Sequence, residues 1–176
     1  MATTTSQLLQ EHSSKSCVTS LFPYGSKSVQ RTSSMATDIS FAFSTLAENS
    51  AHEGPYMAMR LNEQRFETST GGYEHEQIIM QGGKPKRDAW IHVLYRQQGH
   101  KGELFLDGKL IGRNDQMPIL AEIFKEAPAN CWIGRAPFRG DKYLTQTDVA
   151  DLRIYNYAVS NQELKQLKQG FDNMKY

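Results

Sequence analysis

The chain has 176 residues, of which 39% are hydrophobic and 22% charged, so it can bury the core of one ordinary domain and has little room for a second. Its 20 basic and 19 acidic side chains give a net charge of +1 without long runs of one sign, which argues against a nucleic-acid or anionic-membrane partner. No apolar stretch approaches the roughly 18 residues of a membrane-spanning helix, so no membrane partner is expected.

The N-terminal region predicts an extension followed by a domain. Residues 1–36 are rich in Ser and Thr and poor in large apolar groups, which favours an extension with a first edge strand near 17–22. From residue 37 the pattern becomes regular, and we predict one domain over 37–170 and a tail over 171–176. The chain start lacks the basic and apolar regions of a secretory signal, so the chain is expected to be cytosolic or cut from a longer exported protein.

The middle of the chain reads as short strands. Ile39, Phe41 and Phe43 alternate with small residues, which is the period of a strand with one buried face. The segments 56–61, 65–68 and 77–81 repeat that pattern, with a polar loop at 73–76. The segments 91–96, 103–106 and 109–112 then form a β-meander, because Asp107-Gly108 favours a tight turn.

The last third adds two strands and two helices. Segments 132–134 and 151–155 read as strands, and we place Trp90 and Trp132 in the core. The capping box formed by Ser160 and Glu163 begins a helix that should end at Gly170. A small amphipathic helix is expected between 115 and 127. These elements predict an all-β fold, a two-sheet antiparallel jelly-roll sandwich with one or two short helices.

Three stretches of the chain carry a resemblance to a known family. They are the segments at 88–112, 131–135 and 148–167, and the matching residues are Trp90, His92, Val93, Leu106, Asp107, Gly108, Ile133, Gly134, Asp151, Arg153, Ile154, Tyr155, Asn156, Ser160 and Glu163. In this order they resemble the laminin-G-like branch of the concanavalin A-type lectin/glucanase superfamily over about 38–168. The resemblance implies a jelly roll but no single function, because this fold carries lectins, carbohydrate-binding modules, hydrolases and spacer domains.

The sequence offers little for catalysis. A glycoside hydrolase needs two carboxylates about 5–10 Å apart, and the only pair with strand spacing, Glu74 and Glu76, falls in the polar loop. We therefore predict no catalytic residues. Relatives often hold one calcium ion, so the resemblance allows a structural calcium, but no metal-binding residues or other cofactor are predicted. Cys17 and Cys131 could form a disulfide or stay free, and the sequence leaves both open.

Three loops have the composition of a sugar site, in which an aromatic ring stacks on the sugar and polar groups bond its hydroxyls. The predicted ligand-binding residues are Tyr73 and His75 in the first loop, Asn114 in the second, and Arg135, Phe138, Arg139 and Tyr143 in the third.

These features predict a noncatalytic carbohydrate-binding or accessory module of a larger glycan-processing enzyme, with a polysaccharide or oligosaccharide as partner and a covalently linked catalytic domain as a second one. If the module is excised from an exported protein, it is extracellular or periplasmic. Two alternatives stay open: a structural domain that packs on a catalytic neighbour, and a glycoside hydrolase.

Overall fold

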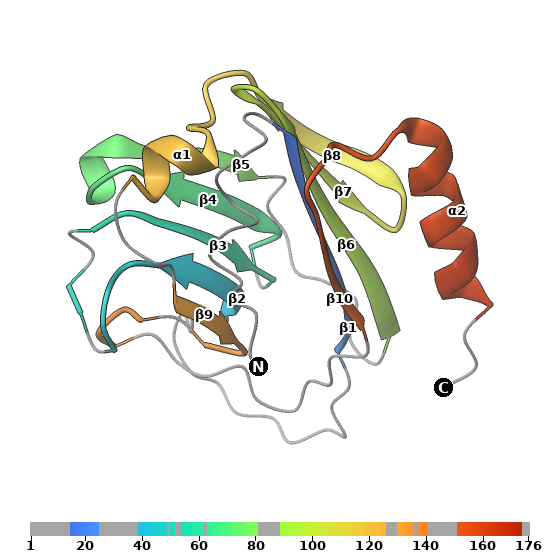
Figure 1. Ribbon diagram of the computed structural model, residues 1–176. Coiled ribbons are helices and arrows are strands. Elements are labelled where there is room, and N and C mark those ends of the chain that lie inside the picture. The colour runs from blue at the N-terminus through green and yellow to red at the C-terminus, as the bar shows by residue number, and fades with distance from the viewer. Residues whose placement is uncertain are drawn as a thin grey trace, which may run out of the picture.

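Figure 1 shows the computed structural model, which describes residues 15–24, 39–48, 50–51, 54–61, 63–80, 89–125, 130–135, 137–140 and 151–173. Within these residues the strands form two five-stranded antiparallel sheets that face each other. Sheet A has the order β10 (Asp151–Tyr155), β1 (Lys15–Tyr24), β6 (Ala89–Gln98), β7 (Lys101–Leu106) and β8 (Lys109–Asn114). Sheet B has the order β5 (Glu76–Met80), β4 (Arg65–Ser69), β3 (Tyr56–Arg60), β2 (Ile39–Ser44) and β9 (Asn130–Ile133). The all-β jelly-roll sandwich predicted from the sequence is confirmed.

The main core lies between the two sheets because alternate residues of each strand point inward. Sheet B contributes Phe41, Met57, Met59, Phe66 and Ile79, and sheet A contributes Ile91, Val93, Tyr95 and Leu104. The rings of Phe66 and Tyr95 stack across the interface with their centroids 3.6 Å apart. The buried hydroxyl of Tyr95 donates a hydrogen bond to Gln97, so this ring joins the sheets without leaving a polar atom unpaired.

The β7–β8 hairpin shows why the sequence predicts these turns well. Asp107 and Gly108 both have positive φ, 49° and 76°, as a two-residue hairpin turn of the mirror-image type requires. Asp107 also accepts a hydrogen bond from the backbone N–H of His92 and donates its own N–H to the carbonyl of His92. The turn is thereby tied to the neighbouring strand β6, and the backbone of His92 is held in place.

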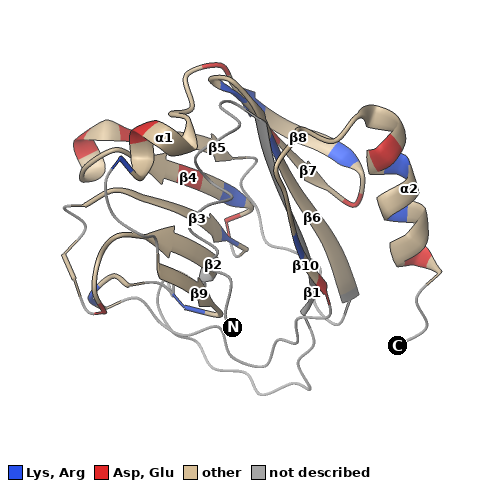
Figure 2. Cartoon of the chain, viewed as in Figure 1, with Lys and Arg blue, Asp and Glu red and all other residues tan. Residues whose placement is uncertain are grey.

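The outer face of sheet B carries a buried network of charges. Glu67 on β4 is fully buried, and its carboxylate lies 2.8 Å from Nε of Arg60 and 2.7 Å from Nε of Arg65. Arg65 also contacts Glu76, which in turn accepts a hydrogen bond from the hydroxyl of Tyr56. Figure 2 shows both signs of charge on the strands of this sheet. Desolvation raises the pKa of Glu67, and the two arginines offset part of that rise.

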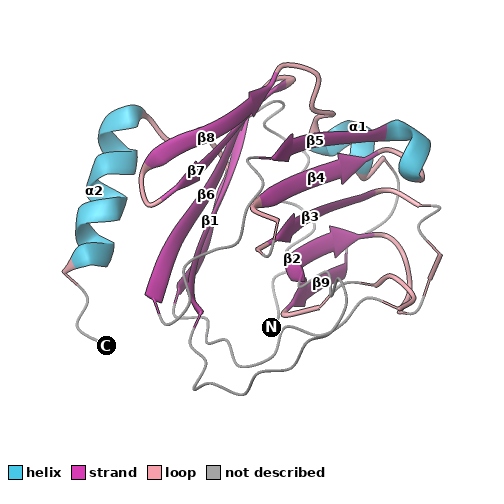
Figure 3. Cartoon of the chain, turned by 180° about the vertical axis from the view of Figure 1, so that it is seen from behind, coloured by secondary structure: helices cyan, strands magenta, loops and turns pink. Residues whose placement is uncertain are grey.

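Helix α2 (Asn161–Asp172) covers the outer face of sheet A, on the side away from sheet B (Figures 1 and 3). Leu94 and Phe105 of the sheet pack against Val159 and Leu164. The predicted capping box is confirmed, since the Ser160 hydroxyl accepts from the N–H of Glu163 and the Glu163 carboxylate accepts from the N–H of Ser160. The helix runs past Gly170 because Phe171 reaches back to the ring of His92, with centroids 5.8 Å apart.

Several details differ from the expectations of the sequence. The strand β1 lies between β10 and β6 and is not an edge strand. The helix expected within 115–127 is the single turn α1 (Leu120–Ile123), because the N–H of Met117 bonds to the carbonyl of His100 and holds the preceding chain extended. Trp90 and Trp132 are only half-buried, and Trp132 packs at the margin of the smaller cluster around Tyr56 and Phe138. For the cysteines the sequence left both states open, and Cys131 on β9 (Asn130–Ile133) is an exposed free thiol.

Candidate functional site

A groove lies between α2 and the strands β10 and β6 of sheet A. Arg96 on β6 fixes the start of α2, because one guanidinium nitrogen donates to the carbonyl of Val159 and to the side chain of Asn161, both at 2.9 Å. The guanidinium is held from the other side by Glu103. With the helix fixed at its start by Arg96 and near its end by Phe171, a cleft of about 250 Å³ remains beneath it.

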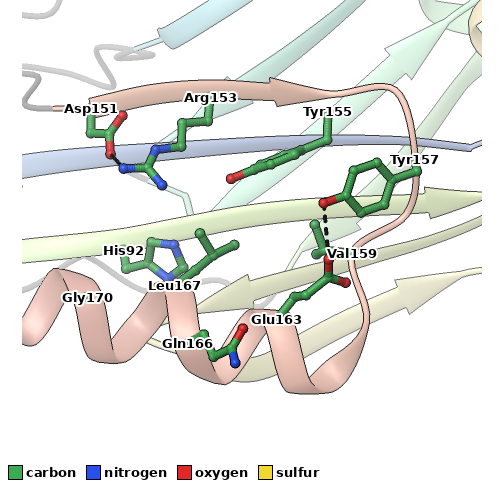
Figure 4. Close-up of a pocket in the computed structure, with 10 residues that line it drawn as sticks. All are labelled: His92, Asp151, Arg153, Tyr155, Tyr157, Val159, Glu163, Gln166, Leu167 and Gly170. Atoms are coloured by element: carbon green, nitrogen blue, oxygen red, sulfur yellow. Dashed lines mark hydrogen bonds and ion pairs between the residues drawn. The ribbon is translucent and has the colours of Figure 1, made fainter.

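We call this cleft the α2 groove, and Figure 4 shows its side chains converging from the sheet and the helix. Its lining residues are His92, Asp151, Arg153, Tyr155, Tyr157, Val159, Glu163, Gln166, Leu167 and Gly170. Asp151, Arg153 and Tyr155 share one face of β10 because they stand at alternate positions of the strand. Cavities that enclose a drug-sized ligand measure about 300–1,000 Å³, so this groove suits one end of a longer ligand.

One side of the groove is polar and charge-balanced. Nη2 of Arg153 lies 2.8 Å from the carboxylate of Asp151. The hydrogen bond to Asp151 raises the pKa of Arg153, and a further hydrogen bond to Tyr155 adds to that rise. Arg153 therefore already forms an ion pair with a carboxylate of its own strand, Asp151.

The other side combines aromatic rings with a carboxylate. Tyr155 and Tyr157 lie edge to face with centroids 5.6 Å apart, and Tyr157 is 41% exposed. The hydroxyl of Tyr157 donates to Glu163 at 3.0 Å. Hydrogen bonds from the backbone of Ser160, from its hydroxyl and from Tyr157 lower the pKa of Glu163, so this carboxylate stays ionised at neutral pH.

The floor of the groove holds a histidine with no hydrogen-bond partner. His92 is 1% exposed, and neither of its ring nitrogens has a partner in the structure. Desolvation lowers its pKa to about 4, so the ring is neutral at physiological pH. A neutral imidazole has one N–H donor and one acceptor nitrogen, and both are unused here.

The loop residues predicted from the sequence lie elsewhere, at one end of sheet B. Phe138 is 2% exposed and packs edge-on against Tyr56, with centroids 4.8 Å apart, so its ring anchors the loop and is not presented to solvent. Two backbone hydrogen bonds join Ser50 to Pro137 and Arg139, which leaves Arg139 on the surface. Arg135 pairs with Glu48 at 2.6 Å. Tyr143 lies outside the described residues.

The other predicted residues lie on a short turn before β5 and at the end of β8. Tyr73 and His75 form a short 3₁₀ turn, η1 (Tyr73–His75), which is tied to the chain before β3 by the hydrogen bond from Gly72 to Gly54. Tyr73 is 60% exposed. Asn114 uses its side-chain amide to bond Gln77 and the carbonyl of Ile78 on β5, so it joins the two sheets. We call Tyr73, His75, Asn114, Arg135 and Arg139 the loop surface.

None of the residues of the loop surface lines the α2 groove. The sequence did not point to the groove, because the pattern of 151–155 indicated only a strand. The available signal was the alternation of acid, base and tyrosine on one strand, followed by a second tyrosine at Tyr157.

Glu74 and Glu76, the two carboxylates with strand spacing, lie in different surroundings. Glu76 begins β5 and is not a loop residue; it bonds to Tyr56 and Arg65. Glu74 is on the surface, with 83% of its side chain exposed. Within the described part of the chain, no three His, Cys, Asp or Glu residues are placed to hold a metal ion together. In that same part, no helix is long and apolar enough to cross a membrane.

The family assignment follows from a match that covers most of the chain. Residues 29–165 match the family model described as the concanavalin A-like lectin/glucanases superfamily. The chain belongs to this superfamily. No curated protein is similar enough to the sequence to count as a match.

Solved structures share the concanavalin A-like fold at low sequence identity. Domain 4 of AbnA, an extracellular arabinanase from Geobacillus stearothermophilus solved with arabinotriose, is 14% identical with a TM-score of 0.64, and the match covers 92% of this chain and 69% of that domain. The Ruminococcus gnavus sialidase module CBM40, solved with α2,3-sialyllactose, is 12% identical with a TM-score of 0.63 and coverages of 88% and 83%. A leech intramolecular trans-sialidase is 12% identical with a TM-score of 0.66, and the match covers 93% of this chain but 24% of the enzyme.

Proposed function

We propose that this chain is a noncatalytic carbohydrate-binding domain that holds an oligosaccharide, or the end of a polysaccharide, in the α2 groove. The observation that carries the proposal is the groove itself, where Tyr155 and Tyr157 lie beside Arg153, Asp151 and Glu163. Sugar rings stack their C–H faces on aromatic rings and bond their hydroxyls to such charged groups. Two solved neighbours, each with a bound oligosaccharide, support the proposal.

The loop surface is a second proposed contact for a longer ligand. Tyr73 and Arg139 are its exposed aromatic and basic side chains, and His75 lies beside Tyr73. Arg135 and Asn114 position the surrounding loops through Glu48 and the strand β5. Phe138 anchors its own loop against Tyr56, and Tyr143 is proposed as a further contact on sequence grounds alone.

We also propose that the domain is part of a larger, exported glycan-processing protein. In support, one neighbour is a single domain of an extracellular arabinanase, and another matches the chain over only 24% of a trans-sialidase. A noncatalytic role predicts that a retained polysaccharide releases no new reducing ends during incubation with the chain.

The binding test is affinity electrophoresis of the chain through gels that contain neutral and acidic plant and microbial polysaccharides. We expect retention on at least one of them. Tyr157→Ala should weaken that binding about five- to thirtyfold, because it removes a stacking ring worth roughly 1–2 kcal/mol. Tyr157→Phe, which keeps the ring, is the matched control and should bind nearly as the parent does.

Arg139→Ala separates the two surfaces. If the loop surface supplies the main contact, this variant loses binding while Tyr157→Ala keeps it, and the groove is then excluded as the primary site. If no polysaccharide retains the parent chain, the carbohydrate-binding proposal is wrong, and a structural domain that packs on a catalytic neighbour becomes the better account.

A further inference from the structure

The floor of the α2 groove contains an anomaly that packing does not explain. His92 is 1% exposed, yet both ring nitrogens lack a hydrogen-bond partner in the structure. A buried polar group without a partner destabilises a fold, and such groups in native proteins call for a ligand, a bound water or a chemical role. Figure 4 shows the ring at the base of the groove, between β10 and α2.

The wall above His92 contains a second departure from ordinary packing. Gly170 lies inside α2 and lines the groove, although glycine weakens a helix interior relative to alanine. A Cβ atom at this position would meet no heavy atom within 4 Å, so neither steric crowding nor a positive φ requires glycine there. A side chain at position 170 would therefore extend into open space.

The charges around this opening disfavour an anion. The groove is lined by two carboxylates, Asp151 and Glu163, against one guanidinium, Arg153. Arg153 is already paired with Asp151 at 2.8 Å. To bind here, the carboxylate of an acidic sugar would have to displace Asp151 from Arg153. It would also approach the carboxylate of Glu163, and two negative charges close together repel each other.

We infer that the α2 groove binds an uncharged sugar whose hydroxyl groups bond to the ring nitrogens of His92, which acts as a specificity-determining residue. A hydroxyl both donates and accepts hydrogen bonds, so it matches a neutral imidazole. The tyrosine pair stacks on the sugar, and Gly170 lines the groove without a side chain of its own. This inference rests on the proposed function and adds the class of sugar and the residue that selects it.

The first experiment measures affinity by calorimetric titration at low salt. The uncharged probes are arabinotriose, xylotriose and lactose, and the acidic probes are trigalacturonic acid and 3′-sialyllactose. We expect an uncharged probe to bind and the acidic probes to bind at least about tenfold more weakly. Asp151→Asn removes the carboxylate that pairs with Arg153. The difference in affinity between the uncharged and the acidic probes should therefore be smaller in this variant. Acidic probes that bind as tightly as uncharged ones would overturn the inference and leave the carbohydrate-binding function intact.

The second experiment uses variants that separate a ligand-binding histidine from a structural one. His92→Phe keeps an aromatic ring but removes both nitrogens, so it should weaken the uncharged probe about tenfold and raise the midpoint of thermal unfolding of the ligand-free chain. His92→Leu has a side chain closer in volume to histidine, and we expect it to show the same two changes as His92→Phe. A structural histidine would give the opposite sign, with a lowered midpoint in both variants, and that result contradicts the inference.

Gly170 provides the matched pair of variants. Gly170→Leu places a bulky side chain in the groove and should block binding of the uncharged probe. Gly170→Ala is a small change and should keep this binding. Both variants should stabilise α2, because both residues favour a helix more than glycine does. Full binding by Gly170→Leu would place the ligand elsewhere and overturn the inference. Failure of every probe together with every polysaccharide gel would instead reject the proposed function, and the two failures are therefore distinguishable.

Discussion

Replacing Glu67 with Ala is expected to lower the free energy of unfolding by about 3–5 kcal/mol, because it removes one member of a buried ion network and leaves its partners unbalanced. Glu67 is fully buried and its carboxylate lies within 2.8 Å of Arg60 and within 2.7 Å of Arg65. The side chain of Arg60 is itself only 6% exposed. Without the carboxylate, that buried guanidinium would lose the ion pair it makes with Glu67.

Denaturant titration by circular dichroism measures this effect. The matched control is Glu74→Ala, because the side chain of Glu74 is 83% exposed on the neighbouring turn and its removal should change stability by less than about 0.5 kcal/mol. A Glu67→Ala chain as stable as the Glu74→Ala chain would show that the network contributes nothing, and the burial of Glu67 would then need another explanation.

Acidification between pH 6.5 and pH 4 should destabilise the chain through His92 by about 3 kcal/mol. Desolvation lowers the pKa of His92 in the folded chain from 6.5 to about 4. Asp107, Asp151 and Asp172 favour the protonated ring and Lys168 opposes it, but burial outweighs them. The unfolded chain therefore takes up a proton that the folded chain does not, and the stability present above pH 6.5 is lost as the pH falls towards 4.

The comparison of the parent with His92→Phe isolates this effect, because all other titrating groups are the same in both chains. The free energy of unfolding should fall with decreasing pH by about 1.4 kcal/mol per unit more in the parent than in the variant over this window. Parallel curves for the two chains would show that His92 titrates alike in the folded and unfolded states, and hence that its ring is solvated in the native chain.

Most elements of this fold could be predicted from the sequence because their causes are local. The strand of Ile39, Phe41 and Phe43 follows from its alternation, and the turn at Asp107 and Gly108 follows from the two residues that accept positive φ. The C-terminal helix follows from the capping box, whose two hydrogen bonds span only three residues. The family resemblance rests on the same local patterns.

The candidate groove could not be found this way, because its residues come from segments far apart in the chain. His92 on β6 meets Phe171 on α2 because the helix packs on sheet A. The loop residues illustrate the converse: Arg139 and Tyr73 are exposed as expected, whereas Phe138 from the same loop is buried against Tyr56. Composition identifies polar and aromatic loops, but the burial of each side chain depends on its distant neighbours.

The sequence by itself therefore determined the class of fold, the strands, the hairpin turn and the start of α2, since hydrophobic period and local hydrogen bonds act over a few residues. Only the tertiary structure decided that β1 lies inside sheet A, that Glu67 is enclosed by two arginines and that His92 is buried without a partner beside Gly170. These features depend on desolvation and on contacts between remote segments, and both of these arise only when the sheets and the helix pack together.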